Sequence, residues 1–187
     1  MSKVLRLVKV QTGQCKMALG EIIKMNVDLG KLNTAVEFLV NQKTFLESVE
    51  HLSKEINHSQ EAFVWSVIDL STIETELPEG IRSSWIFVLK SDVPSGCHYH
   101  PNSVQHMVTI KGQGMSKVAG EYRRMVLLGS SNDSLADKWL VIGKGVPHEF
   151  FPEKEKMVVV SFHTCEATEL EEVDCETGER RIYEREI

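Results

Sequence analysis

The sequence lacks the long apolar runs and the excess of basic residues that mark several large classes of protein. No apolar run approaches the ~20 residues that a membrane span needs. Residues 1–14 contain neither an apolar stretch nor a small-residue cleavage site, so we expect no signal peptide. Lys and Arg number 21 against 27 Asp and Glu, and no basic patch is present to contact a phosphate backbone. We therefore expect no membrane and no nucleic-acid partner.

Cysteines are few and widely spaced. Cys15, Cys97, Cys165 and Cys175 fit no close-spaced zinc pattern. Because no export signal precedes them, a disulfide framework is not expected, and a reducing, cytoplasmic location is the better interpretation.

The negative charge is concentrated at one end of the chain. Residues 166–187 hold nine acidic residues against three arginines, which accounts for the whole net charge of −6. A turn at 175–178 predicts a hairpin there. We expect this acidic hairpin to be a solvated surface element.

Residues 1–60 have a helical pattern. One helix is expected over about 14–29, ended by Gly30. A second is expected to begin at Thr34, because Thr34 and Glu37 have the spacing of a capping box, and to end near residue 57. An apolar stripe follows along it: Phe38, Leu39, Phe45, Leu46, Val49, Leu52 and Ile56. The stripe must cover either the remainder of its own chain or a second subunit, and we expect a homodimer.

From residue 61 the period of the sequence changes from helical to extended. Short β-branched or aromatic runs, separated by turn residues, occupy 63–70, 83–90, 104–111, 122–128, 139–142 and 157–164. The gaps between them are too short for crossover helices, which predicts antiparallel sheets in a sandwich, barrel or jelly roll. We divide the chain into a helical extension, 1–60, and a β region with the acidic hairpin, 61–187.

Histidines carry the clearest chemical signal. Five of the seven lie between residues 98 and 163. In an extended chain His98 and His100 point to the same side, so both rings can hold one ion. Gln105 follows at the start of a predicted strand, and His148 lies further along the chain, in Gly-Lys-Gly-Val-Pro-His.

This pattern resembles the cupin family of small metal-binding β-barrels. The first cupin motif is matched by His98-x-His100, four residues, Gln105, six residues and Gly112, and the second by Gly143-x-Gly145, two residues and His148. The resemblance implies a mainly β fold, an antiparallel cupin-type jelly-roll barrel with an N-terminal helical extension. It also implies one divalent metal ion, Fe, Ni, Mn or Zn, held by His98, His100, Gln105 and His148.

The departure that affects the chemistry is Gln105, which stands where the cupin motif has Glu. Glutamine supplies a neutral oxygen, as in cupins that use three His and one Gln. His106 is the alternative ligand, but as the neighbour of Gln105 on a strand it should point to the opposite face. His163 lies on the last long strand and is either a catalytic acid or base or a structural histidine.

The fold does not decide the function. The leading hypothesis is an enzyme, a dioxygenase, isomerase or lyase, that acts on a small polar organic molecule through a mononuclear metal. The alternative is a non-catalytic metal- or ligand-sensing module. An inward-facing carboxylate or histidine beside the metal site would favour catalysis.

Overall fold

The computed structural model describes residues 27–183. Within that range no helix is long and apolar enough to cross a membrane. Two helices precede the strands: α1, Leu29–Leu39, and α2, Lys43–Glu55. The helix expected over 14–29 falls largely outside the described residues.

The helix boundaries differ from those expected. Asp28 caps α1, because its Oδ1 accepts hydrogen bonds from the N–H groups of Gly30 (2.9 Å) and Lys31 (3.2 Å). Thr34 is therefore inside the helix, where its hydroxyl donates to the Gly30 carbonyl at 3.0 Å. The expected capping box at Thr34 and the expected stop at Gly30 are both wrong, because an N-cap aspartate six residues upstream starts the helix earlier.

The strands form two antiparallel sheets. The first sheet has the order β1-β2-β9-β4-β7, with β1 Phe63–Ile68, β2 Ser83–Leu89, β9 Met157–His163, β4 Gln105–Lys111 and β7 Trp139–Ile142. The second has the order β11-β10-β3-β8-β5-β6, with β11 Arg180–Ile182, β10 Glu171–Asp174, β3 His98–Tyr99, β8 His148–Pro152, β5 Gly114–Val118 and β6 Glu121–Arg124. The expected mainly β fold, with antiparallel sheets and helices before them, is confirmed.

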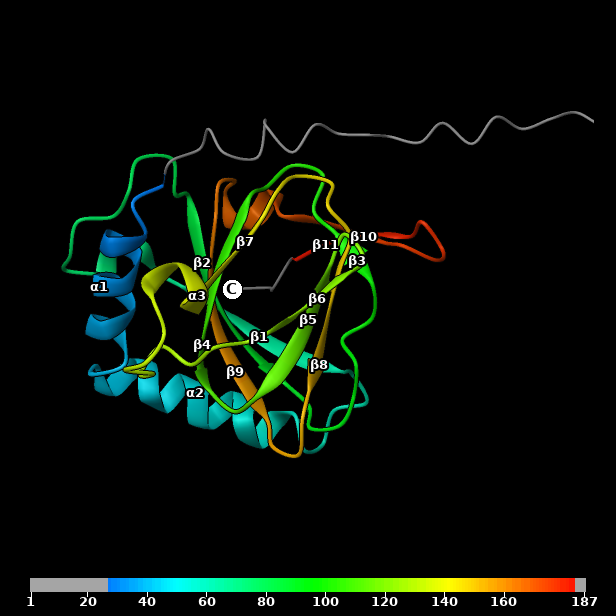
Figure 1. Ribbon diagram of the computed structural model, residues 1–187, viewed down its shortest axis with the longest axis horizontal. Helices are drawn as coiled ribbons and strands as arrows, with labels where there is room; N and C mark the ends of the chain where they lie inside the picture. Colours follow the sequence, from blue (N-terminus) through cyan, green and yellow to red (C-terminus); the bar gives the residue numbers. More distant parts are fainter. Residues whose placement is uncertain (1–26, 184–187) are drawn as a thin grey trace, which may run out of the picture.

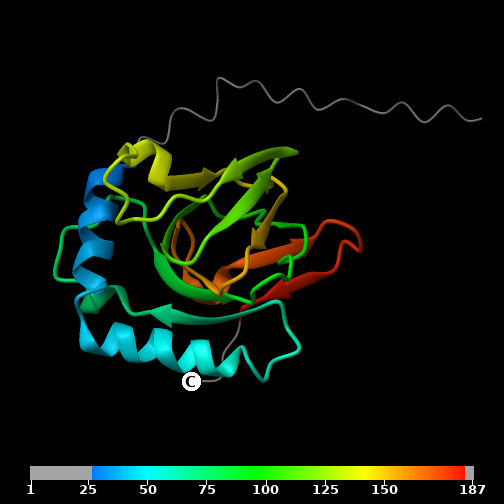
Figure 2. The ribbon, with the colours of Figure 1, turned by 60° about the horizontal axis from the view of Figure 1, so that its bottom comes forward.

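The first sheet is covered on both faces. Figures 1 and 2 show α1 and α2 on its outer side and the second sheet on its inner side. Every residue of β2 and β9 is buried, which explains why both read as nearly continuous apolar runs rather than as alternating ones. One apolar cluster lies between the helices and this sheet, and a second lies between the two sheets.

The apolar stripe of the helices is used within the chain itself. Leu39, Phe45, Leu52 and Ile56 are buried in the cluster between helices and sheet, whereas Leu46 is half exposed. The stripe therefore covers the sheet of its own chain, so it no longer gives a reason to expect a homodimer. The division of the chain at residue 60 stays a prediction.

The C-terminal hairpin corrects two expectations. Its turn lies where expected, between β10 and β11, but β10 pairs with β3 and so joins the second sheet. Glu172 and Tyr183 are buried, so the hairpin is not simply a solvated element. Cys97 and Cys175 form a disulfide, contrary to the expected absence of disulfides, because the pairing of Asp174 with His98 brings the two cysteines together.

Candidate metal centre

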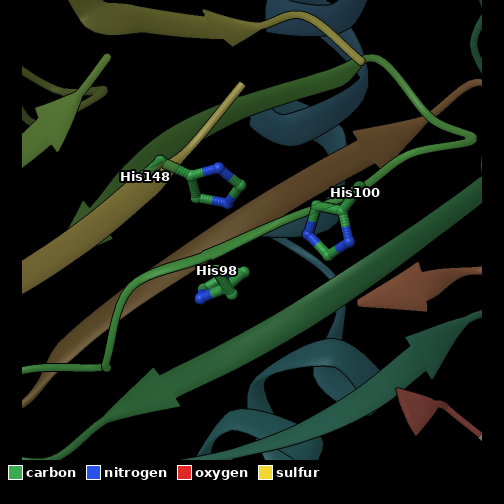
Figure 3. A group of neighbouring side chains, drawn as sticks. All are labelled: His98, His100 and His148. Carbon is green, nitrogen blue, oxygen red and sulfur yellow. The ribbon is translucent and has the colours of Figure 1, made fainter. Parts of the chain in front are cut away.

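Three histidines converge between the sheets. His98 is on β3, His100 follows it, and His148 begins β8. Each contributes one ring nitrogen to a group whose atoms all lie within 4.8 Å of one another (Figure 3). His98 and His148 face each other in register, with ring centroids 4.3 Å apart. The structure therefore brings together the three histidines that the sequence proposed as ligands.

Local backbone geometry explains the placement of these rings. The extended conformation of β3 directs His98 and His100 to the same side. Gly145 adopts a φ of 68°, a conformation that favours glycine, and its N–H donates to the His100 carbonyl at 2.8 Å. This bond ties the loop before His148 to the segment that carries His100.

Hydrogen bonds fix which nitrogen of each ring faces the centre. The Nδ1 atoms of His98, His100 and His148 lie 3.1, 2.9 and 2.9 Å from the backbone carbonyls of Gly96, Glu171 and Val146. A carbonyl only accepts, so each Nδ1 carries a proton, and in the neutral form of each ring the Nε2 has the free lone pair. Metal-ligating histidines are held in this way.

The pKa values of His100 and His148 favour the neutral rings that a metal ion requires. Burial, reinforced by the neighbouring His98, lowers the pKa of His100 from 6.5 to about 4. Burial, together with His98 and His100, lowers the pKa of His148 well below 6.5. These two rings are neutral at neutral pH and able to bind a cation without first releasing a proton.

Gln105 adds an oxygen donor on the same side. It opens β4 and is 3% exposed, and it lines a small cavity together with His98. Its Oε1 and the His148 Nε2 are buried without a hydrogen-bond partner among the described residues. Buried polar atoms are normally satisfied, so the two orphaned acceptors fit a bound cation.

His106 lies on the other face of β4. It pairs in register with Phe162, whose side chain belongs to the cluster beneath the helices, and cross-strand partners share a face. Burial lowers the pKa of His106 to about 4. The strand alternation that separated Gln105 from His106 in the sequence is present in the structure.

His163 faces the space between the sheets but has its own partners. Its Nε2 lies 2.8 Å from the Ser161 hydroxyl and its Nδ1 lies 3.2 Å from the Ser103 hydroxyl. Its ring centroid is 5.5 Å from that of His100. Burial lowers the pKa of His163 well below 6.5. The ring therefore borders the histidine group without joining it, and a catalytic role stays a proposal.

Sequence reasoning missed one residue at this centre, Glu172 on β10. Its Oε2 lies 3.6 Å from the His98 Nε2, and Arg181 and Tyr183 both donate hydrogen bonds to its carboxylate. Burial tends to raise its pKa, but His98, Tyr183 and Arg181 together hold that pKa below its usual value. The signal was the hairpin register, since a turn at 175–178 places Glu172 opposite Arg181.

The cavity beside His98 and Gln105 has mainly apolar walls. It is lined by aromatic and aliphatic side chains from both sheets, with a serine and a tyrosine among them: Phe63, Phe87, Leu89, Ser95, Met107, Phe150, Val159 and Tyr183. It has the apolar walls and converging polar groups of a small-molecule site, but its volume, about 20 Å³, is much smaller than that of the usual pocket.

No protein-family model and no curated protein matches the sequence. Similar solved structures include salicylate 1,2-dioxygenase from Pseudaminobacter salicylatoxidans, at 12% identity and a TM-score of 0.48, covering 66% of this chain and 34% of the other. The cupin domain of Cnp3 from Schizosaccharomyces pombe shows 10% identity and a TM-score of 0.41, covering 56% and 65%. A recombinant oxalate oxidase in complex with glycolate shows 14% identity and a TM-score of 0.41, covering 57% and 52%.

The chain thus spans less than two thirds of each of these three proteins. The cupin resemblance read from the two motifs is confirmed at the level of the fold: the chain has two antiparallel sheets, and its motif histidines meet between them.

Proposed function

We propose that this protein is a mononuclear-metal cupin enzyme, with His98, His100, His148 and Gln105 as the metal ligands. The observation that supports it best is the set of three Nδ1–carbonyl contacts, because they leave three Nε2 lone pairs directed at one point. Gln105 adds an orphaned oxygen beside them. Three imidazoles and an amide oxygen suit Fe(II), Ni(II), Mn(II) or Zn(II).

A divalent ion at such a site acts as a Lewis acid toward a substrate oxygen. The chain itself supplies the environment. The histidine rings are locked by backbone carbonyls, and the aromatic walls of the neighbouring cavity exclude water from a bound ligand. We propose a small organic substrate that directs oxygen atoms toward the histidines and an apolar part toward Phe87 and Phe150.

Two inward-facing titratable groups favour catalysis over sensing. Glu172 lies against His98, and His163 borders His100. A titratable group beside the metal site can accept a proton from a bound substrate or donate one to it. The proposed reaction classes are dioxygenase, isomerase and lyase, with His163 as the proposed acid or base.

Metal analysis after chelation and reloading tests the ligand assignment. His98→Ala, His100→Ala and His148→Ala should each lose most of the bound metal while far-UV circular dichroism stays that of the parent protein. His58→Ala, at an exposed position after α2, is the matched control and should retain it. Near-stoichiometric metal in all three variants would refute the assignment.

Catalysis is tested separately on the metal-loaded protein. A panel of small hydroxy acids, keto acids and phenolic acids is screened for oxygen uptake and for product formation by mass spectrometry. Turnover that disappears in His148→Ala supports the enzyme. Ligand binding without turnover across the panel favours the alternative, a sensing module.

The homodimer also belongs to this proposal, whereas the Cys97–Cys175 disulfide removes the support for the expected reducing, cytoplasmic location. Light scattering at micromolar concentration distinguishes a dimer from a single chain of 21.2 kDa.

A further inference from the structure

Glu172 brings a carboxylate to the centre from a part of the chain outside both motifs. It is 5% exposed, and β10, which carries it, pairs with β3, which carries His98. Its Oε2 and the His98 Nε2 are 3.6 Å apart. Each histidine Nδ1 is held by a carbonyl, so the nitrogen that Glu172 faces is the one that is directed into the site.

The carboxylate is held in place by the other strand of the hairpin. Arg181 donates from Nε at 3.1 Å and from Nη2 at 2.5 Å to Oε1, and the Tyr183 hydroxyl donates to Oε2. The Arg181 guanidinium also lies 5.6 Å from the ring centroids of Phe63 and Tyr183. Glu172 is therefore a fixed charge, and one of its oxygens is turned toward the histidines.

The ligand set itself has no charge. Three neutral imidazoles and the Gln105 amide would surround a divalent cation without neutralising it, and a charge that is buried without a counter-charge is unfavourable. Among the described residues, only the three histidines have ligand atoms that all lie within 4.8 Å of one another. Glu172 is thus a neighbour of the ligands rather than one of them.

We propose that Glu172 supplies the negative charge of the metal site, in place of the carboxylate that Gln105 lacks. This inference rests on the proposed metal site. Glu172 acts through its charge rather than as a ligand: it stabilises the cation electrostatically, and Arg181 and Tyr183 hold it in place. The C-terminal hairpin is then part of the metal site rather than a surface appendage.

The neighbouring residue offers a matched control. Glu171 is on the same strand and makes the same kind of contact, from its Oε1 to Arg180 Nη1 at 2.5 Å. Adjacent strand residues point to opposite faces, so the Glu171 side chain is directed away from the site. Glu171→Gln removes the same charge one residue from Glu172 while keeping the backbone carbonyl that holds His100.

The experiment measures Zn²⁺ and Mn²⁺ affinity by competition with a chromophoric chelator. Glu172→Gln should weaken binding by about 10–100-fold, the usual effect of losing an outer partner of a metal ligand. Glu171→Gln should leave the affinity close to that of the parent protein. Unchanged affinity in Glu172→Gln would overturn the inference.

A rescue variant separates charge from structure. If Glu172 replaces the missing motif carboxylate, Gln105→Glu combined with Glu172→Gln should restore the affinity lost in Glu172→Gln. Because Gln105→Glu adds a ligand charge by itself, the single variant Gln105→Glu is the reference. Glu172→Gln should cost much less affinity in the Gln105→Glu background than in the parent protein, and an equal loss in both backgrounds would overturn the inference.

Failure of the metal site itself has a different signature. If His148→Ala retains the metal, the proposed function fails whatever Glu172→Gln does. If His148→Ala loses the metal and Glu172→Gln does not, only the role of Glu172 fails.

Discussion

Acidification toward pH 4 should destabilise this fold, because buried histidines are held in their neutral form. The pKa of both His100 and His106 is lowered from 6.5 to about 4, with burial as the first cause. An unfolded chain takes up protons at these positions below about pH 6.5, whereas the folded chain does not until about pH 4. The stability that they contribute is therefore complete above pH 6.5 and is lost as the pH falls toward 4.

The magnitude follows from the two pKa values. A change from 6.5 to about 4 corresponds to about 3 kcal/mol for each ring once both states are protonated, and to about 2 kcal/mol each at pH 5. His100 and His106 together should thus lower the free energy of unfolding by about 4 kcal/mol at pH 5. His148 and His163, whose pKa values are also lowered, act in the same direction.

Urea unfolding of the chelator-treated protein at about pH 7.5 and about pH 5 measures this difference. Chelation is needed because a bound metal would hold the histidines deprotonated by itself. The variant His106→Leu, in the apolar cluster beneath the helices, should reduce the pH dependence by about 2 kcal/mol. Equal stability at the two pH values would show that the buried rings are not neutral and would refute the reasoning.

Three further predictions concern other parts of the molecule. Cys97→Ser combined with Cys175→Ser should lower the free energy of unfolding by about 4 kcal/mol, because the disulfide closes a loop of 78 residues. A thermal unfolding midpoint that changes neither in this variant nor on adding dithiothreitol to the parent protein would contradict this. Leu52→Ala should lower the free energy of unfolding by about 2–5 kcal/mol, because this side chain is only 1% exposed, whereas Leu46→Ala, at a side chain that is 51% exposed, should lower it by less than about 0.5 kcal/mol. Equal destabilisation of the two variants by calorimetry would mean that α2 does not cover the sheet. His106→Leu should keep the full metal content by mass spectrometry, and loss of the metal would reverse the face assignment on β4.

The sequence was informative where a local pattern determines the structure. Alternation in β4 separates Gln105 from His106, and the His98-x-His100 spacing in an extended segment brings two rings to one side. Both depend only on the two-residue period of a strand. The convergence with His148 required the second motif as well, because nothing local relates residues 50 positions apart.

The features that the sequence did not predict depend either on competition between two possible helix caps or on the pairing of strands that are distant in the sequence. Thr34 and Asp28 are both good helix caps, and only the packing of α1 on the sheet decides between them. The disulfide and the burial of Glu172 follow from the pairing of β10 with β3, which joins segments more than 70 residues apart. A run of acidic residues predicts a solvent-exposed segment, and the pairing of Glu172 with Arg181 can be predicted only once the strand register of the hairpin is known.

The pairing of β3 with β10 has a consequence for when the proposed metal site would form. During synthesis, His98, His100 and His148 all emerge before residues 171–183. That later segment includes the carbonyl that orients His100, the strands that carry Glu172 and Arg181, and Tyr183 just after the last strand. Contacts of such sequence separation form late and slowly. A nascent chain would therefore present three loosely held imidazoles, and selection of the ion would occur only after the last strands have docked.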